Sequence, residues 1–258
     1  MQVPQLIPER TLIRAQVGSH AYGTSTPESD TDFMEVVAAS DQVYLSLDWF
    51  GSQGTMEKKE KDEDGNLLSE ETSYELTKFM RLCQNFNPNV IPLLWVSQYE
   101  HVDPLGQVLI ENRRIFNSKR AIDSFAGYAF RQLEKMGVDN PATGRMGAKR
   151  KAIRDKFGFD TKYMYHAVRL ARMIGEFFSC NGAVLMVDRR GIDAEELKAI
   201  REGAWTYEQG RDEILRLLEA SKEAASASSL PDEPDKQAIR DLARYILRKH
   251  LRIDAHAA

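Results

Sequence analysis

The fold of this 258-residue chain is indicated by one stretch of sequence: Gly18-Ser19-His20-Ala21-Tyr22-Gly23, followed by Pro27 and then Ser29-Asp30-Thr31-Asp32. It joins two segments that have the composition of β-strands, 11–17 (TLIRAQV) and 31–38 (TDFMEVVA). Glycine allows a backbone to approach a ligand closely, and free N–H groups at the start of a helix bind phosphate. Gly18 and Ser19, with its hydroxyl, are therefore candidate phosphate-binding residues.

Two acidic residues open the second of these strands. Asp30 and Asp32 are two positions apart, so on a strand their side chains project to the same face. Carboxylates crowded together repel unless a cation lies between them, and Mg²⁺ prefers oxygen ligands. Phosphate-binding residues beside a two-carboxylate metal site are typical of phosphoryl or nucleotidyl transfer, with Mg²⁺ or Mn²⁺ as cofactor. The alternative is an ordinary turn or helix cap, for which Pro-Glu-Ser-Asp-Thr-Asp is also a common composition.

The remainder of the first hundred residues mixes strand and helix patterns. Asp64-Gly65 is a hairpin signal within the charged stretch 56–75. The other predicted elements are a weak strand at 43–49, a helix at 73–86 and a buried apolar piece at 91–96.

Beyond about residue 117 the chain has a helical pattern, with predicted helices at 119–136, 161–180, 193–203, 207–225 and 236–252. Segment 137–149 is predicted to be a mobile loop, and 226–235, rich in Ser and Pro, another loop. We therefore expect an α+β catalytic domain over residues 1–117 and a helical domain over 118–258. The cleft between the two is the expected ligand site.

The Gly-Ser and Asp-x-Asp elements together resemble the signature of the polymerase-beta nucleotidyltransferase superfamily. Further motifs resemble one branch of it, the RNA-repair-associated, polymerase-beta-like predicted nucleotidyltransferases of bacteria and phages, over about residues 13–210. These motifs are Tyr74-Glu75-Leu76-x-Lys78-Phe79, Asn87-Pro88-Asn89-Val90, Phe159-Asp160-Thr161-Lys162-Tyr163 with His166-x-x-Arg169-Leu170, and Ile200-Arg201-x-Gly203. The resemblance implies a mixed sheet with flanking helices, followed by a helical C-terminal part.

The resemblance also implies a third carboxylate, which matches Glu70, although Asp is common there in similar sequences. Glu71 is the alternative, and since neighbours on a strand face opposite sides, only one of the two is expected in the site. Glu75 is expected to have a structural role at a helix N-terminus. The third acid can also act as general base toward the acceptor hydroxyl.

The segment 131–172 is strongly basic, with eleven basic and four acidic residues in a chain whose net charge is −4. Within it, Lys162, His166 and Arg169 fall on one helical face and are candidate nucleotide-binding residues. A solvated helix face is the alternative for the charge run, and a structural role is the alternative for His166. Tyr22 is predicted either to contact nucleotide or to pack the turn.

The resemblance implies an enzyme that transfers a nucleoside monophosphate from a nucleoside triphosphate such as ATP to an acceptor hydroxyl and releases pyrophosphate. Asp30, Asp32 and Glu70 are the predicted catalytic and metal-binding residues, and an RNA or tRNA end is the predicted acceptor. The alternatives are nucleotidylation of a small molecule or protein, and a non-catalytic, antitoxin-like binding module.

Composition and missing motifs exclude other classes. The chain is 42% hydrophobic and 29% charged, without an apolar run long enough for a membrane span. Its two cysteines suggest a reducing compartment, so a cytoplasmic location is expected. The sequence lacks a P-loop, a dinucleotide-binding Gly-x-Gly-x-x-Gly, a nucleophile elbow and a His-Glu-x-x-His motif.

Overall fold

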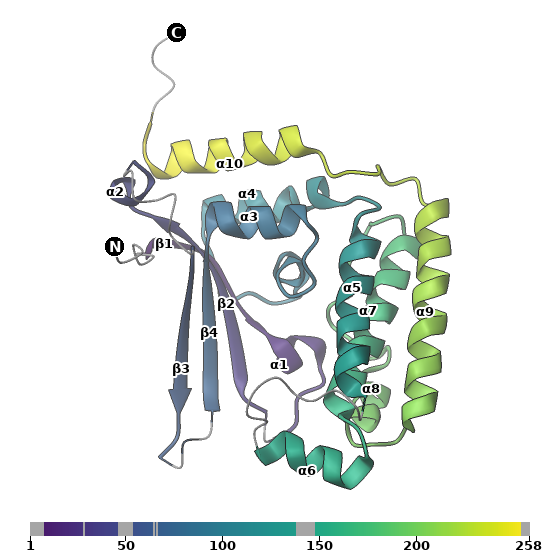
Figure 1. Cartoon of the computed structure of the whole chain (residues 1–258). Helices are drawn as coiled ribbons and strands as arrows, with labels where there is room; N and C mark the ends of the chain where they lie inside the picture. Colours follow the sequence, from purple (N-terminus) through teal and green to yellow (C-terminus); the bar gives the residue numbers. More distant parts are fainter. Residues whose placement is uncertain are drawn as a thin grey trace.

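The structure is a computed structural model that describes residues 8–27, 29–45, 54–63, 65, 67–137 and 148–253, with side chains from 151 onward in the last range. Its N-terminal part is built on a mixed sheet in the order β3-β4-β2-β1-β5 (Figure 1). The strands are β1 (Pro8–Val17), β2 (Thr31–Ala39), β3 (Thr55–Lys61), β4 (Leu67–Glu75) and β5 (His101–Val102). The predicted strands at 11–17 and 31–38 and the hairpin at 56–75 are confirmed.

The register of the central strands determines which side chains meet. β2 and β4 are parallel, and Asp32 is the partner of Glu70. Paired residues project to the same face, as do every second residue before and after them. In the antiparallel pair of β1 and β2, Val17 is opposite Asp32, so the chain leaves β1 beside Asp32 and enters α1 (Gly18–Tyr22).

The weak strand predicted at 43–49 is wrong in its first residues. Val43 and Tyr44 belong to the short helix α2 (Asp41–Tyr44), and residues 46–49 lie outside the described ranges. The Tyr44 hydroxyl donates a hydrogen bond of 2.6 Å to Glu75, which fixes α2 against the end of β4. This tertiary contact outweighs the weak strand propensity of a short aromatic segment.

Helices and 3-10 turns cover the sheet and continue into a bundle. The predicted helix at 73–86 is observed as α3, which starts three residues later because 73–75 still belong to β4, and the apolar piece at 91–96 is the buried 3-10 helix η2. These elements of the N-terminal part are α3 (Leu76–Gln84), η2 (Ile91–Trp95), α4 (Pro104–Glu111) and η3 (Arg113–Phe116).

The C-terminal part is helical, as the sequence predicted. Helices α5, α7, α8 and α9 form a bundle beside the sheet, and α6 lies below it (Figure 1). Their bounds are α5 (Ala121–Met136), α6 (Ala148–Phe157), α7 (Thr161–Ser179), α8 (Ala194–Arg201) and α9 (Tyr207–Ala227). Four predicted helices are thus confirmed within a few residues, whereas α6 and α4 were not predicted. Of the mobile loop predicted at 137–149, residues 138–147 lie outside the described ranges, and the prediction is wrong for 148 and 149, which begin α6.

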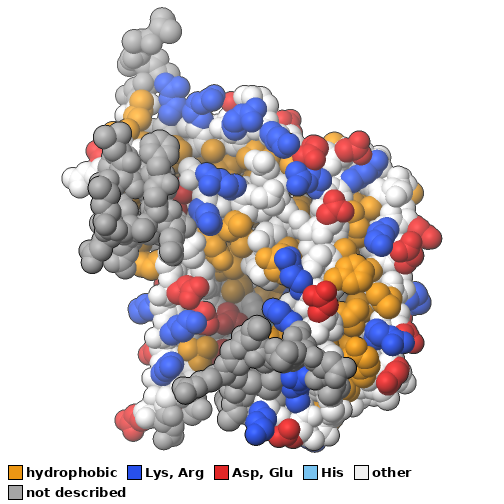
Figure 2. Space-filling model, viewed as in Figure 1, with side chains coloured by type: hydrophobic (Ala, Val, Ile, Leu, Met, Phe, Trp, Pro, Cys, Tyr) orange, Lys and Arg blue, Asp and Glu red, His pale blue; other side chains and the backbone are white. Residues whose placement is uncertain are grey.

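The last helix, α10 (Lys236–His250), returns to the N-terminal part and packs on α3 and α4. Its buried residues Ile239 and Ile246 belong to the same hydrophobic cluster as the sheet and the bundle. In the interior of that cluster the Phe86 ring lies 4.9 Å from Phe177 and 5.9 Å from Phe125. The core is therefore continuous across residue 117, and two separate domains remain a sequence-based prediction. Figure 2 shows Lys and Arg side chains spaced along the outer side of α10.

None of the helices in the described ranges combines the length and the apolar composition that a bilayer span requires.

Candidate active site

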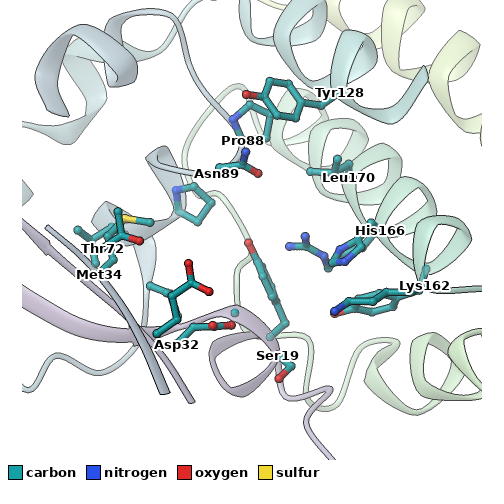
Figure 3. A pocket seen from close by; sticks show the side chains of 18 of the residues that line it. Ser19, Asp32, Met34, Thr72, Pro88, Asn89, Tyr128, Lys162, His166 and Leu170 are labelled. Atoms are coloured by element: carbon teal, nitrogen blue, oxygen red, sulfur yellow. The ribbon is translucent and has the colours of Figure 1, made fainter. Parts of the chain in front are cut away.

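A cavity of about 520 Å³ opens between the sheet and the helical bundle. In Figure 3, Asp32, Met34 and Thr72 project into it from β2 and β4, and Lys162, His166 and Leu170 face them from α7. All nine residues singled out from the sequence line this one cavity: Gly18, Ser19, Tyr22, Asp30, Asp32, Glu70, Lys162, His166 and Arg169.

Gly18 is required by the local geometry where β1 meets α1. Its φ of +64° is in the left-handed region, and a Cβ at this position would lie 2.0 Å from Oδ2 of Asp32. Any side chain there would be strained and would displace the carboxylate. Glycine thus keeps the backbone against Asp32 and places Ser19 at the cavity wall.

Three carboxylates gather at the sheet side of the cavity. The pKa of Asp32 is raised above its ordinary value, first by burial and then by the charges of Asp30 and Glu70, while Lys162 and His20 act in the opposite direction. A carboxyl group crowded by two others and partly removed from water is stabilised in its ionised form by a hard cation. The donor chemistry therefore fits Mg²⁺.

The alternation along β4 separates Glu70 from its neighbour. Glu70, Thr72 and Tyr74 face the cavity. Glu71 projects to the opposite face of the sheet, where its carboxylate accepts a hydrogen bond of 2.8 Å from Arg14, which also pairs with Glu35 and Glu100. Of the two predicted candidates, Glu70 is thus the one that the fold brings to Asp30 and Asp32.

The three carboxylates do not converge on one point in this conformation. In the described part of the chain, no three His, Cys, Asp or Glu side chains are close enough to hold a metal ion together. Glu70 instead forms an ion pair with Lys59 of β3, 3.1 Å away. Metal binding by Glu70 therefore requires that it exchange Lys59 for the metal.

Glu75 has the structural role expected from its position. It is fully buried, and its carboxylate accepts hydrogen bonds from the backbone N–H groups of Thr77 and Lys78 at the start of α3. The Tyr44 hydroxyl donates a further one. The burial and the nearby charge of Glu75 raise the pKa of Tyr44 far above its ordinary value.

The helical side of the cavity carries positive charge. Lys162, His166 and Arg169 occupy successive turns of α7 and line the cavity. Arg169 is only 7% exposed, its guanidinium lies 3.6 Å from the centre of the Tyr22 ring, and its Nε has no hydrogen-bond partner. Across the described residues it forms no ion pair with a carboxylate. Its Nη1 donates a weak hydrogen bond to Sδ of Met173 at 3.8 Å. A buried guanidinium without a carboxylate partner is stabilised when an anion binds.

Tyr22 supports Arg169 from below, which gives it a packing role at the cavity. The α1 segment that carries it is held by the loop before α8, because the Arg189 N–H donates to the Tyr22 carbonyl and Arg190 Nη2 donates to the His20 carbonyl at 2.8 Å. The hydroxyls of Thr24 and Tyr165 are hydrogen-bonded at 2.6 Å and join this turn to α7.

The basic segment 131–172 does not form one continuous surface in the part that is described. Arg172 is paired with Asp193 and Glu196, and Arg131 stacks on the ring of Tyr128. Lys151 and Lys156 are exposed on α6, whereas the side chains of 149 and 150 lie outside the described residues. Among those of the segment's basic residues whose side chains are described, Lys162 and Arg169 line the cavity.

Sequence reasoning missed several lining residues. Arg201, Tyr74 and Asn89 line the cavity and belong to motifs that carried the family resemblance, so a signal for them existed. Tyr128 and Gln132 of α5 also line it. Nothing in the sequence distinguished these two from other residues on an amphipathic helix.

Comparison with known proteins confirms the resemblance. A family model described as "RNA repair pathway DNA polymerase beta family" matches residues 5–248. An uncharacterized 38.9 kDa protein of Enterobacteria phage T4, from the nrdC-mobD intergenic region, is 28% identical over 152 residues. That alignment covers 57% of this chain and 42% of the phage protein, so the chain spans less than half of this relative.

Among solved structures, a nucleotidyltransferase-like protein from Exiguobacterium sibiricum aligns with 96% of this chain and 76% of its own, at 10% identity and a TM-score of 0.30. A score this low does not establish a common fold. The family model, in contrast, spans almost the whole sequence. The chain therefore belongs to the RNA repair pathway DNA polymerase beta family.

Proposed function

We propose that this protein transfers a nucleoside monophosphate from a nucleoside triphosphate to a hydroxyl at an RNA end, with a divalent metal as cofactor. The observation that carries the proposal is the polarity of the cavity. Asp30, Asp32 and Glu70 form one wall, and the buried, carboxylate-free Arg169 lies on the other. A metal-bound triphosphate satisfies both walls at once, since it brings cations to the carboxylates and anionic oxygens to the guanidinium.

In this proposal Asp30, Asp32 and Glu70 would hold Mg²⁺, which would neutralise the charge on the reacting phosphate. Lys162 and Arg169 bind the phosphate oxygens and stabilise the charge that develops on them. The acceptor oxygen forms a bond to the α-phosphorus, and the bond from that phosphorus to the bridging oxygen breaks as pyrophosphate leaves. Glu70 accepts the proton of the acceptor hydroxyl.

Support for an RNA acceptor comes from the family description and from α6. Phe157, the last residue of α6, packs its ring where a Cβ at Gly203 would project. The end of α6 therefore lies beside the end of α8, which contributes Arg201 to the cavity. Lys151 and Lys156 are exposed on it, suited to a polyanion that enters the cavity. A small-molecule or protein acceptor leaves these lysines without a role. An antitoxin-like module has no need of three cavity carboxylates.

The role of Arg169 is tested by Arg169→Met, which keeps the apolar stem over Tyr22 and removes the charge. We expect the affinity for ATP with Mg²⁺, measured by calorimetry, to fall at least about tenfold, as for the loss of a charge-assisted hydrogen bond. The melting temperature should change little, because no ion pair with a carboxylate is broken, a buried charge is removed and the methionine keeps an apolar contact with the Tyr22 ring. The control Arg211→Met, on the exposed side of α9, should bind like the wild type. Unchanged affinity in Arg169→Met would remove the main support for the triphosphate position.

A further inference from the structure

The cavity has two chemically different ends, and the proposed function uses only one of them. Carboxylates and cations surround Asp32 and Lys162. The opposite end is marked by Pro88, Asn89 and Tyr128. Four further uncharged residues line the cavity: Tyr74 of β4, Pro92 and Leu93 of η2, and Gln132, one turn after Tyr128 on α5. In Figure 3, Tyr128, Pro88 and Asn89 lie together, away from Ser19 and Lys162. This second group, the Pro88 end, contains no charged residue.

The composition of the Pro88 end suits a flat, uncharged ring with polar edges. The nearby cation Arg131 stacks on the Tyr128 ring at 4.5 Å and is not among the lining residues, whereas prolines, a leucine and two tyrosines provide apolar and aromatic surface. A nucleoside triphosphate whose phosphates lie against Lys162 and Arg169 has to place its base somewhere in the same cavity. The volume of about 520 Å³ is within the usual range for a small-molecule site.

Asn87 fixes the geometry of this end. Its side-chain oxygen accepts the backbone N–H of Asn89 at 2.9 Å, and its Nδ2 donates to the Tyr128 hydroxyl at 3.3 Å. The motif Asn87-Pro88-Asn89 thus orders its own turn and orients an aromatic ring from α5. The proposed transfer chemistry assigns no role to this motif, but a preformed ring-binding site explains it.

Two amides at this end are available to a ligand. The side chains of Asn89 and Gln132 have no hydrogen-bond partner within the described part of the chain, and Gln132 lies one turn after Tyr128 on the same face of α5. Each amide offers a donor and an acceptor. Adenine presents a donor at N6 beside an acceptor at N7, which matches one amide, whereas guanine presents two adjacent acceptors that Arg or Lys recognises better.

We propose that the Pro88 end is a nucleobase site selective for adenine, in which the base packs on Tyr128 and its edge is bound by the amides of Gln132 and Asn89. The inference rests on the proposed function and adds its substrate, ATP. It also makes Gln132 a specificity-determining residue.

Equilibrium binding of ATP, GTP, CTP, UTP and inorganic tripolyphosphate, each with Mg²⁺, tests the base site in the wild type and in Gln132→Leu. This substitution keeps the size of the side chain and removes its polar edge. We expect wild type to bind ATP about tenfold more tightly than the other four ligands. In Gln132→Leu that preference should disappear while tripolyphosphate affinity stays the same. The matched control Gln107→Leu, on the exposed face of α4, should retain the ATP preference.

Tyr128→Ala provides a second measurement, since loss of stacking should weaken all four nucleotides but not tripolyphosphate. Equal affinities for the four nucleotides in the wild type, or an ATP preference that persists in Gln132→Leu, would overturn the base site and leave the proposed function standing. Absence of binding by any of the five ligands would overturn both. Melting temperatures of the variants show whether each is folded.

Discussion

Alternation of side chains along β4 determines which of its acids can act in the cavity. Glu70 faces Asp32 across the parallel pair, whereas Glu71 is held by Arg14 on the opposite face. We expect Glu70→Gln to lower the rate of nucleotidyl transfer at least about a hundredfold, because it removes a metal ligand or general base. Rates should be measured with saturating nucleotide.

Glu71→Gln is the matched control, since it makes the same change one residue away. It should keep most of the activity and lose some thermal stability through the broken pair with Arg14. A large loss of activity in Glu71→Gln, with Glu70→Gln active, would contradict the role assigned to Glu70.

The ionised carboxylate of Asp32 should lower the free energy of unfolding, and a bound metal should restore it. Its pKa is raised by burial and by Asp30 and Glu70, so the ionised form destabilises the folded protein once the pH exceeds the ordinary value of about 4. Asp32→Asn should therefore raise the melting temperature at pH 7 in buffer with a chelator, and the difference should vanish below about pH 4. Added Mg²⁺ should stabilise wild type and not the variant.

Differential scanning calorimetry with and without Mg²⁺ makes this measurement. A melting temperature that falls in chelator, or Mg²⁺ stabilisation that is equal in the two proteins, would count against a metal at Asp32.

At the level of elements, two basic helices are candidates for the RNA-binding surface that the proposed function requires. α6 carries the exposed Lys151 and Lys156, and its last residue, Phe157, packs at Gly203 just after α8. α10 presents Lys236, Arg240, Arg244 and Arg248 at intervals of one turn, all exposed, on the far side of α3 and α4 (Figure 2). A charged helix face is often only solvated, so position relative to the cavity decides between them.

We expect the double variant Lys151→Glu/Lys156→Glu to bind a short single-stranded RNA at least about tenfold more weakly at low salt, because two phosphate contacts and their counterion release are lost. The slope of log affinity against log salt should become shallower by about 1.4. ATP affinity should stay the same, since neither lysine lines the cavity.

Arg240→Glu/Arg248→Glu makes the same change in charge on α10 and should bind RNA like the wild type. Loss of RNA binding in this control alone would move the RNA to α10. Unchanged RNA binding in both variants would favour a small-molecule or protein acceptor.

For the whole molecule, local patterns in the sequence predicted most of the fold. Helices with a strong apolar stripe, such as α7 with Met164, Leu170 and Phe177, were predicted nearly to their ends. α6 was missed because its sequence, AKRKAIRDKF, has few apolar residues. α4 was not predicted, although Asp103, directly before Pro104, caps it by accepting a hydrogen bond of 2.7 Å from the Leu105 N–H.

The residues that line the cavity also divide into those that the sequence predicted and those that it did not. The residues around Gly18 and Asp32 belong to one short stretch of sequence, 18–32. The motif on α7 has helical spacing, so both groups were predictable. Tyr128 and Gln132 were not, because only the packing of α5 against the segment after α3 places Tyr128 at Asn87 and brings both residues to the cavity. Residues that reach a site through tertiary packing leave no local signal.

The most direct test of the central claim follows the fate of the phosphates. Wild type and Asp32→Asn are incubated with Mg²⁺, RNA and ATP labelled at either the α- or the γ-phosphate. If the reaction is nucleotidyl transfer, the wild type attaches the α-label to RNA and releases the γ-label as pyrophosphate. The Asp32→Asn variant does neither. Attachment of the γ-label to RNA, or equal transfer of the α-label by the Asp32→Asn variant, would contradict the account.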